Sequence, residues 1–153
     1  MISILLVDDH TYIRRGIRSL LEATADMEVV ATASNGIEGI AKARLYQPDV
    51  AIMDISMPFM DGLEAIRQIR GLCPQTRVLT LSIYDNPAYI EGALQAGVRG
   101  YILKDAIGDE LLEAIRILHR GERYFSPRVA SHIFPALEND NSTGSAREGR
   151  RTS

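Results

Sequence analysis

The sequence has one cysteine, Cys73, and no hydrophobic run long enough to cross a bilayer. A single cysteine excludes an internal disulfide framework and a metal site of the Cys-x-x-Cys type. The apolar run near the N-terminus is short and no basic leader precedes it, so neither a membrane span nor a signal peptide is expected. These absences predict a cytoplasmic protein that makes no membrane contact.

The sequence also has no excess of positive charge. It contains 17 basic and 20 acidic residues, which gives a formal net charge of −3. This balance argues against a chain that binds nucleic acid through bulk electrostatics. Lys42 and Lys104 are the only lysines, so a lysine at a special structural position is a candidate for a functional role.

Common nucleotide-binding and hydrolytic motifs are missing as well. The sequence has no GxGxxG, GxxxxGK[ST], GxSxG or HExxH pattern, which excludes the sites that those motifs build. A flavin-binding protein whose fold alternates strands and helices would place a Ser/Thr-rich phosphate loop after its first strand, which here would be the apolar run that ends at Val7. Asp8 and Asp9 stand there instead, and they would repel a phosphate in the absence of a metal.

The chain does contain a regular alternation of short apolar runs and helical patterns. Its length of 153 residues is that of one compact domain with a tail. Its composition, 46% hydrophobic and 24% charged, is ordinary for a globular protein. Near-continuous apolar strands are typical of a parallel sheet covered on both faces, and right-handed crossovers lead to an open doubly wound sheet. The sequence therefore predicts an α/β fold with five (βα) units. The expected strands are 3–7, 27–33, 49–53, 77–81 and 100–103.

Local signals place several helix ends. Asn35 followed by Glu38 predicts a helix start, and Pro48 stops that helix. Pro87 predicts the first position of a later helix, and Gly97 its end. The last helix of the repeating pattern is expected over 109–119.

The pattern changes after Gly121. A short extra helix is expected from Ser126-Pro127 to Ile133, and Pro135 would close it. We therefore divide the chain into an α/β domain (1–122), the start of a short helical linker (123–136) and a flexible polar tail or linker (137–153).

Polar residues follow the predicted strands where ligand sites of open α/β sheets lie. Asp8 and Asp9 directly follow the first strand, Asp54 the third, Ser82 the fourth and Lys104 the fifth. In a sheet ordered 2-1-3-4-5 these strand ends converge. Carboxylates gathered in one crevice need a compensating cation, and Mg²⁺ suits a site of few carboxylates, waters and a phosphoryl oxygen.

These residues and the motifs around them resemble the receiver domain of two-component response regulators. The carrying stretches are Asp8-Asp9, the segment MDISMPFMDG around Asp54, Ser82, and GYILKD around Lys104. The resemblance covers roughly residues 2–120 and implies the flavodoxin-like strand order 2-1-3-4-5. Asp105 directly follows Lys104, at a position where many receivers have proline. This Lys104-Asp105 dipeptide and the early segment from Tyr12 are similar to the subfamily with a LuxR-type (NarL/FixJ-like) helix-turn-helix output.

The resemblance implies a role for each site residue. Asp54 is expected to be the phosphoacceptor. Asp9 and Asp54 are expected to ligate Mg²⁺ together with the backbone carbonyl of Ser56, and Asp8 to act through water.

The resemblance also assigns residues around the phosphoryl group. Lys104 is expected to pair with the phosphoryl oxygens and Ser82 to contact them. Tyr101 is expected to be an aromatic switch that swings inward when Ser82 moves. Ser56 and Tyr84 would flank the access of water to the phosphoryl group.

The expected function is a phosphorylation-controlled signalling module. The resemblance implies a sensor histidine kinase as partner, self-catalysed phosphorylation and dephosphorylation without turnover of an external metabolite, and a phosphorylation-dependent homodimer. Transcription regulation would act through a DNA-binding output domain that the chain lacks. A stand-alone receiver and a non-phosphorylated pseudo-receiver remain alternatives. A Mg²⁺-dependent aspartyl-phosphate phosphatase is a further alternative, although Asp8-Asp9-His10 does not match the D-x-D nucleophile of that class.

Two further features admit functional interpretations. His10, beside the two acids, is expected to be a solvent-facing residue near a helix start rather than a transition-metal ligand, because no second histidine is near it in sequence. Arg14, Arg15 and Arg18 are expected to form a solvated helix face, with an acidic partner surface as the alternative.

Overall fold

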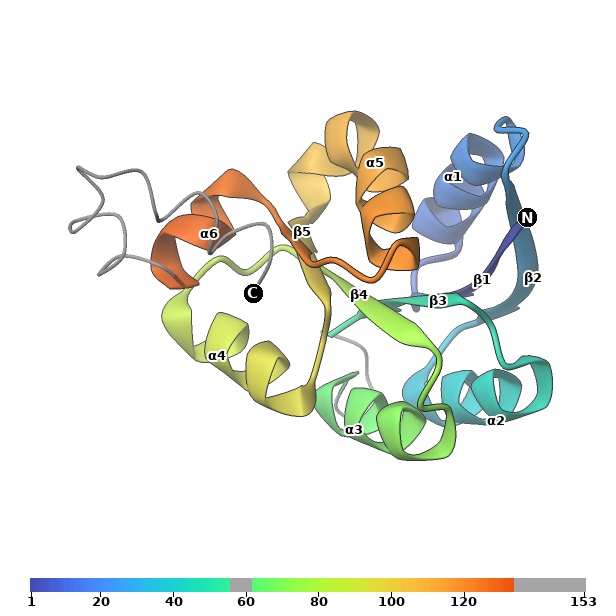
Figure 1. Ribbon diagram of the computed structural model, residues 1–153, viewed down its shortest axis with the longest axis horizontal. Coiled ribbons are helices and arrows are strands. Elements are labelled where there is room, and N and C mark those ends of the chain that lie inside the picture. The colour runs from blue at the N-terminus through green and yellow to red at the C-terminus, as the bar shows by residue number, and fades with distance from the viewer. Residues whose placement is uncertain (56–61, 134–153) are drawn as a thin grey trace.

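The computed structural model describes residues 1–55 and 62–133 and contains one parallel sheet (Figure 1). The strand order is β2-β1-β3-β4-β5-β6, which confirms the predicted order 2-1-3-4-5 and adds a sixth strand at the β5 edge. The strands are β1 (Ile2–Val7), β2 (Met27–Ala33), β3 (Val50–Asp54), β4 (Arg77–Ser82), β5 (Gly100–Leu103) and β6 (Tyr124–Phe125).

Helices cover both faces of this sheet. α1 and α5 lie on one face, and α2, α3 and α4 lie on the other, as Figure 1 shows. A 3-10 turn over Lys104–Ala106 precedes α5. The helices are α1 (Thr11–Glu22), α2 (Gly36–Tyr46), α3 (Gly62–Leu72), α4 (Pro87–Ala96), α5 (Ile107–His119) and α6 (Pro127–Ile133).

The predicted helix signals act as capping groups. The Asn35 side chain accepts a hydrogen bond from the Glu38 backbone N–H at 2.8 Å, and the Glu38 carboxylate accepts from the Ser34 N–H at 2.7 Å. This reciprocal pair resembles a capping box and fixes the start of α2. Gly97 ends α4 in the left-handed region, with φ of 96°, a conformation that glycine adopts without steric cost.

Several element boundaries differ from the sequence prediction by one or two residues: β1 begins one residue earlier, at Ile2, and β3 begins one residue later, at Val50. β3 and β4 each run one residue further, so Asp54 and Ser82 are the last residues of their strands rather than the first residues beyond them. α5 begins two residues earlier, at Ile107. The ladder explains the later strand ends, because Asp54 pairs with Leu81 and Ser82 with Leu103 in register.

The sixth strand is a two-residue element that the sequence analysis did not predict. The Tyr124 N–H donates to the Arg99 carbonyl and the Ser126 N–H to the Tyr101 carbonyl, so β6 extends the ladder beside β5. An alternation pattern needs four or more residues to be detected. α6 then packs beside α4, with Val129 and Ala130 in the core.

The core has two layers, one on each face of the sheet. One joins the sheet to α1 and α5 and the other joins it to α2, α3, α4 and α6. Most strand side chains are buried, which is the pattern of a parallel sheet covered on both sides. Two buried faces leave the loops at the carboxyl ends of the strands as the place for a polar site. The predicted flexible polar tail (137–153) and the end of the predicted linker (134–136) lie outside the described residues.

No helix in the described part of the chain has the length and apolar character needed to cross a membrane.

Candidate functional site

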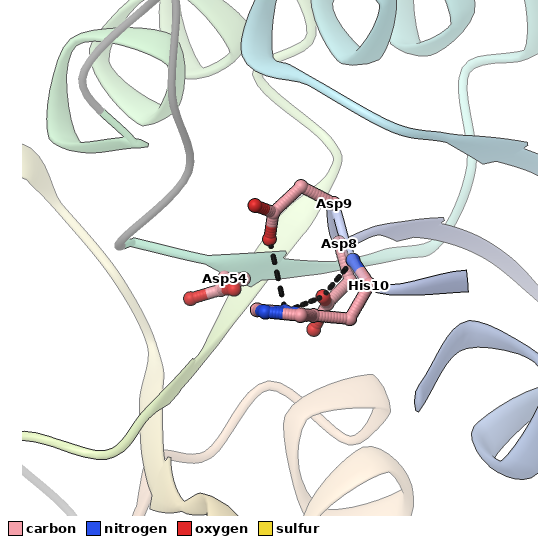
Figure 2. A group of neighbouring side chains, drawn as sticks. All are labelled: Asp8, Asp9, His10 and Asp54. Carbon is pink, nitrogen blue, oxygen red and sulfur yellow. Dashed lines mark hydrogen bonds and ion pairs between the residues drawn. The ribbon is translucent and has the colours of Figure 1, made fainter. Parts of the chain in front are cut away.

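Three aspartates meet at the carboxyl ends of β1 and β3 (Figure 2). Asp8 and Asp54 are fully buried, while the Asp9 side chain is 24% exposed. β1 and β3 are adjacent strands, with Val7 opposite Met53, so parallel pairing alone brings the three carboxylates together. Each offers an oxygen, and His10 a ring nitrogen, within 4.8 Å of the others. The predicted convergence of Asp8, Asp9 and Asp54 is confirmed.

Lys104 supplies the positive charge that this group requires. Its Nζ lies 3.0 Å from Asp54 Oδ2 and 3.3 Å from Asp8 Oδ2. β5 ends at Leu103, opposite Ser82, and the turn that follows directs the ammonium group back toward β3. Burial by itself would lower the pKa of Lys104, but the hydrogen bond to Asp54 and the charges of Asp54 and Asp8 raise it. Lys104 is therefore a fixed cation between the two buried acids.

Asp8 and Asp9 each retain one carboxylate oxygen that accepts no hydrogen bond in the described part of the chain. Asp8 Oδ2 faces Lys104 and the buried Asp9 Oδ1 faces the His10 ring as ion pairs, but neither oxygen accepts a hydrogen bond of good geometry within residues 1–55 and 62–133. Buried carboxylate oxygens of this kind are the donor set that Mg²⁺ prefers. Asp8, Asp9 and Asp54 thus fit a divalent-cation site. Ser56, predicted to contribute its carbonyl, lies outside the described residues.

His10 contacts this acidic group more directly than the sequence indicated. Its side chain is 60% exposed, in keeping with a solvent-facing position, but Nδ1 lies 3.2 Å from Asp8 Oδ1 and 3.1 Å from Asp9 Oδ1. The His10 backbone N–H also donates to Asp8 Oδ1 at 2.9 Å. A carboxylate that accepts from a backbone N–H two residues later makes an Asx turn. The turn orients Asp8, and the adjacency of the three residues was the signal for it.

Arg14 is a supporting residue that the sequence analysis placed on a solvated helix face, or on a surface that meets an acidic partner. Its Nη1 donates to the Asp8 carbonyl oxygen at 2.6 Å. This contact ties the first turn of α1 to the end of β1, so Arg14 holds the backbone that carries the acids. Nothing in the spacing of the arginines distinguished Arg14 from Arg15 or Arg18.

The β4 end of the site contains Ser82, Tyr84 and Tyr101. Ser82 is fully buried, and its Oγ accepts a hydrogen bond from the Tyr84 N–H at 2.9 Å. The Tyr101 hydroxyl donates to the Tyr84 carbonyl at 2.6 Å, and its side chain is 1% exposed. Burial raises the pKa of the Tyr101 hydroxyl. Tyr101 thus lies inward and is hydrogen-bonded to the loop after β4. Its role as a moving switch stays a prediction.

Comparison with known proteins gives consistent results. The family profile of the response regulator receiver domain matches residues 4–116. The oxygen regulatory protein NreC of Staphylococcus carnosus is 39% identical over 138 residues, which are 90% of this chain and 64% of that protein. The transcriptional regulatory protein DegU of Brevibacillus brevis is 36% identical over 86% of this chain and 56% of its own length. The chain therefore spans about 56 to 64% of these two relatives.

Solved structures agree. A LuxR-family two-component response regulator from Aurantimonas sp. SI85-9A1 superposes with a TM-score of 0.84 at 35% identity, over 92% of this chain and 99% of that one. The isolated receiver domain of RcsB from Salmonella enterica serovar Typhimurium, solved with the phosphomimetic BeF3−, superposes with a TM-score of 0.78 at 26% identity, over 86% and 97% of the two chains. The chain belongs to the receiver domain family of two-component response regulators and is related to the regulators of the LuxR type.

Proposed function

We propose that this chain accepts a phosphoryl group from a sensor histidine kinase on Asp54, with Mg²⁺ held by Asp9 and Asp54 and reached by Asp8 through water. The observation that carries the proposal is the position of Lys104, whose ammonium group lies 3.0 Å from Asp54 Oδ2 inside a buried acidic cluster. A phosphoryl group on that oxygen would place its own oxygens beside a cation that is already fixed. Ser56 is included in the metal site as a proposed carbonyl ligand.

The residues of the chain divide the chemistry. An Asp54 carboxylate oxygen attacks phosphorus, and the bond from phosphorus to the imidazole nitrogen of the donor breaks with its electron pair on that nitrogen. Lys104 stabilises the charge on the transferring oxygens, and Ser82 donates one hydrogen bond to them. Bound Mg²⁺ would supply charge neutralisation between the acids and the incoming phosphoryl oxygens. Hydrolysis of the resulting acyl phosphate by water resets the domain, with Ser56 and Tyr84 flanking its approach.

Phosphorylation of Asp54 would then act as a switch. It adds a charge of about −1.5 to −2 next to Lys104, and its oxygens would accept a hydrogen bond from the Ser82 hydroxyl, whose Oγ now accepts from the Tyr84 N–H. The Tyr101 hydroxyl holds the same loop through the Tyr84 carbonyl. Movement of Ser82 is therefore linked to the position of Tyr101 through the same peptide segment. Phosphorylation would shift the population between two positions of this loop.

The output of this switch is proposed from a related regulator. Structures of RcsB include two dimers bound to two parallel DNAs. By analogy, we assign transcription regulation through a DNA-binding output domain, a phosphorylation-dependent homodimer and a cytoplasmic location to the whole protein. In this scheme residues 1–122 are the receiver, 123–136 begin the linker and 137–153 continue it.

Intact-mass analysis after incubation with acetyl phosphate tests the proposal. The wild-type protein should gain a single phosphoryl adduct that requires Mg²⁺. Asp54→Asn should gain none, while Asp105→Asn, one residue beyond Lys104 and 72% exposed, should label like the wild type. An adduct that persists in Asp54→Asn would refute Asp54 as the acceptor. Steady release of inorganic phosphate from a phosphomonoester without a stable adduct would favour a phosphatase instead.

A further inference from the structure

A group of arginines gathers at the pole of the sheet opposite the acidic site. Arg77 begins β4, Arg99 and Arg123 directly precede β5 and β6, and Arg70 lies in the last turn of α3. These are the amino ends of the strands, whereas the aspartates lie at the carboxyl ends. No side chain of the four forms an ion pair with a carboxylate within residues 1–55 and 62–133. Four cations thus lie together without a described counter-charge.

Three of these arginines line a cavity of about 270 Å³. The rest of the lining consists of apolar residues and one glycine. They come from α4, the turn after α4, β6 and the last residue of α6. Basic groups therefore meet an apolar wall in one concavity. The residues are Arg70, Arg99 and Arg123 with Leu94, Gly97, Val98, Phe125 and Ile133.

Arg99 has an unused donor at this place. Its Nη2 donates to the Gly121 carbonyl at 2.7 Å, but its Nε is buried and donates to no acceptor in the described part of the chain. Burial, followed by the charges of Arg123, Arg77 and Arg70, lowers the pKa of Arg99. The guanidinium is therefore partly desolvated and repelled by its neighbours. An anion would relieve both conditions.

Gly97 lets the Arg70 guanidinium approach the cavity wall. A Cβ at Gly97 would come within 2.5 Å of Arg70 Nε, so the guanidinium rests against the bare glycine backbone. The positive φ of Gly97 favours glycine at this position, and the absence of a Cβ leaves room for the Arg70 guanidinium. The backbone therefore helps to fix the orientation of one of the three arginines.

We propose that this cavity is a binding site for a small organic phosphate with an apolar body. The planar donor fork of arginine matches phosphate oxygens, and three guanidinium groups suit a dianion better than a single carboxylate. The apolar wall accounts for the body of the ligand, and the volume lies just below the range for drug-sized ligands, so the molecule is small. The site is separate from the phosphorylation chemistry and goes beyond the proposed function.

Calorimetric titration with phenylphosphonate tests the proposal. The phosphorus–carbon bond of this probe prevents transfer to Asp54, and omission of divalent cations leaves the acidic pole repulsive to anions. The wild-type protein should bind it saturably and roughly tenfold more tightly than methylphosphonate, because the ring covers the apolar wall. Nitrogen-15 NMR should show the Arg99 Nε signal moving with the same saturation curve.

Variants decide whether the binding belongs to this cavity. Arg99→Gln should weaken binding at least tenfold, and Arg123→Gln provides a second variant at a loop position. Arg67→Gln is the matched control, because Arg67 lies on α3 with Arg70 but pairs with Glu64 at the surface. All three variants should still be phosphorylated by acetyl phosphate. Absence of saturable binding at millimolar phenylphosphonate, or equal weakening by Arg67→Gln, would overturn the proposal.

Discussion

Lys104 balances two buried carboxylates, so its charge matters to folding as well as to chemistry. Removal of one partner from a buried ion pair costs about 3–5 kcal/mol, because the remaining charge is left uncompensated. We expect Lys104→Met, which retains most of the side-chain volume, to lower the free energy of unfolding by about 3 kcal/mol in EDTA. Excess Mg²⁺ should recover most of this loss, since a divalent cation replaces the missing charge.

Urea denaturation with and without Mg²⁺ measures this effect, and the other lysine is its control. Lys42 Nζ donates to the Thr32 carbonyl at 2.7 Å, away from the acids. Lys42→Met should cost about 1 kcal/mol or less, and the cost should not depend on Mg²⁺. A Lys104→Met deficit that Mg²⁺ fails to reduce would contradict a cation site at Asp8, Asp9 and Asp54.

Replacement of two buried threonines by valine is expected to change the free energy of unfolding in opposite directions. Thr80 Oγ1 in β4 has no hydrogen-bond partner in the described part of the chain, whereas Thr76 Oγ1 donates to the Pro48 carbonyl at 2.6 Å. A buried polar group without a partner costs about 1–3 kcal/mol. Thr80→Val should therefore raise the free energy of unfolding by about 1 kcal/mol, and Thr76→Val should lower it by a similar amount. Chemical denaturation of both variants checks the signs, and a loss of stability in Thr80→Val would refute the interpretation.

The start of α3 packs directly on the backbone that follows the proposed phosphoacceptor. A Cβ at Gly62 would lie 2.5 Å from Ile55 Cα and 2.9 Å from the Asp54 carbonyl oxygen. Real Cβ atoms do not approach backbone so closely, so α3 or the end of β3 would have to move. We expect Gly62→Ala to destabilise the domain by about 1–3 kcal/mol, as overpacking does, and to slow labelling of Asp54.

Gly71 is the matched control on the same helix. Nothing lies within 4 Å of a Cβ built there. Gly71→Ala should leave labelling unchanged and stabilise the protein by up to about 1 kcal/mol, because alanine is the better helix former. Thermal unfolding and the rate of adduct formation distinguish the two variants. Equal behaviour of Gly62→Ala and Gly71→Ala would show that the close packing against β3 is unimportant.

The elements also show what the sequence could predict. Strands β1 to β5 and their helices followed from apolar runs and capping signals, because a parallel sheet buried on both faces leaves few alternatives. Asp8, Asp54 and Lys104 were expected together because the strand order 2-1-3-4-5, which the resemblance implies, gathers the carboxyl ends of these strands at one edge. β6 escaped notice because two residues carry no periodicity, and the contact of Arg14 with the Asp8 carbonyl depended on a side-chain conformation that spacing does not determine.

For the molecule as a whole, an ion pair joins the turn before β2 to α5, two parts of the chain that are far apart in sequence. Asp26, in the turn before β2, accepts hydrogen bonds from Arg116 of α5 at 2.8 and 3.0 Å, across 90 residues of sequence. The hydrogen bond and charge of Arg116 lower the pKa of Asp26 from 3.8 to about 2. Because the folded-state pKa is the lower one, the pair contributes stability above about pH 4, and that contribution is lost as the pH falls toward about 2.

We therefore expect part of the acid sensitivity of the domain to originate at this pair. Asp26→Asn should flatten the fall in the free energy of unfolding between about pH 4 and pH 2, and Arg116→Gln should flatten it to a similar extent, because either change removes the shift. Urea midpoints across this range for both variants and the double variant measure the effect. The double variant should resemble either single one, since both act on one interaction. Full additivity of the two changes would mean that Asp26 and Arg116 stabilise the fold through separate contacts, and that the turn before β2 is not anchored to α5 by charge.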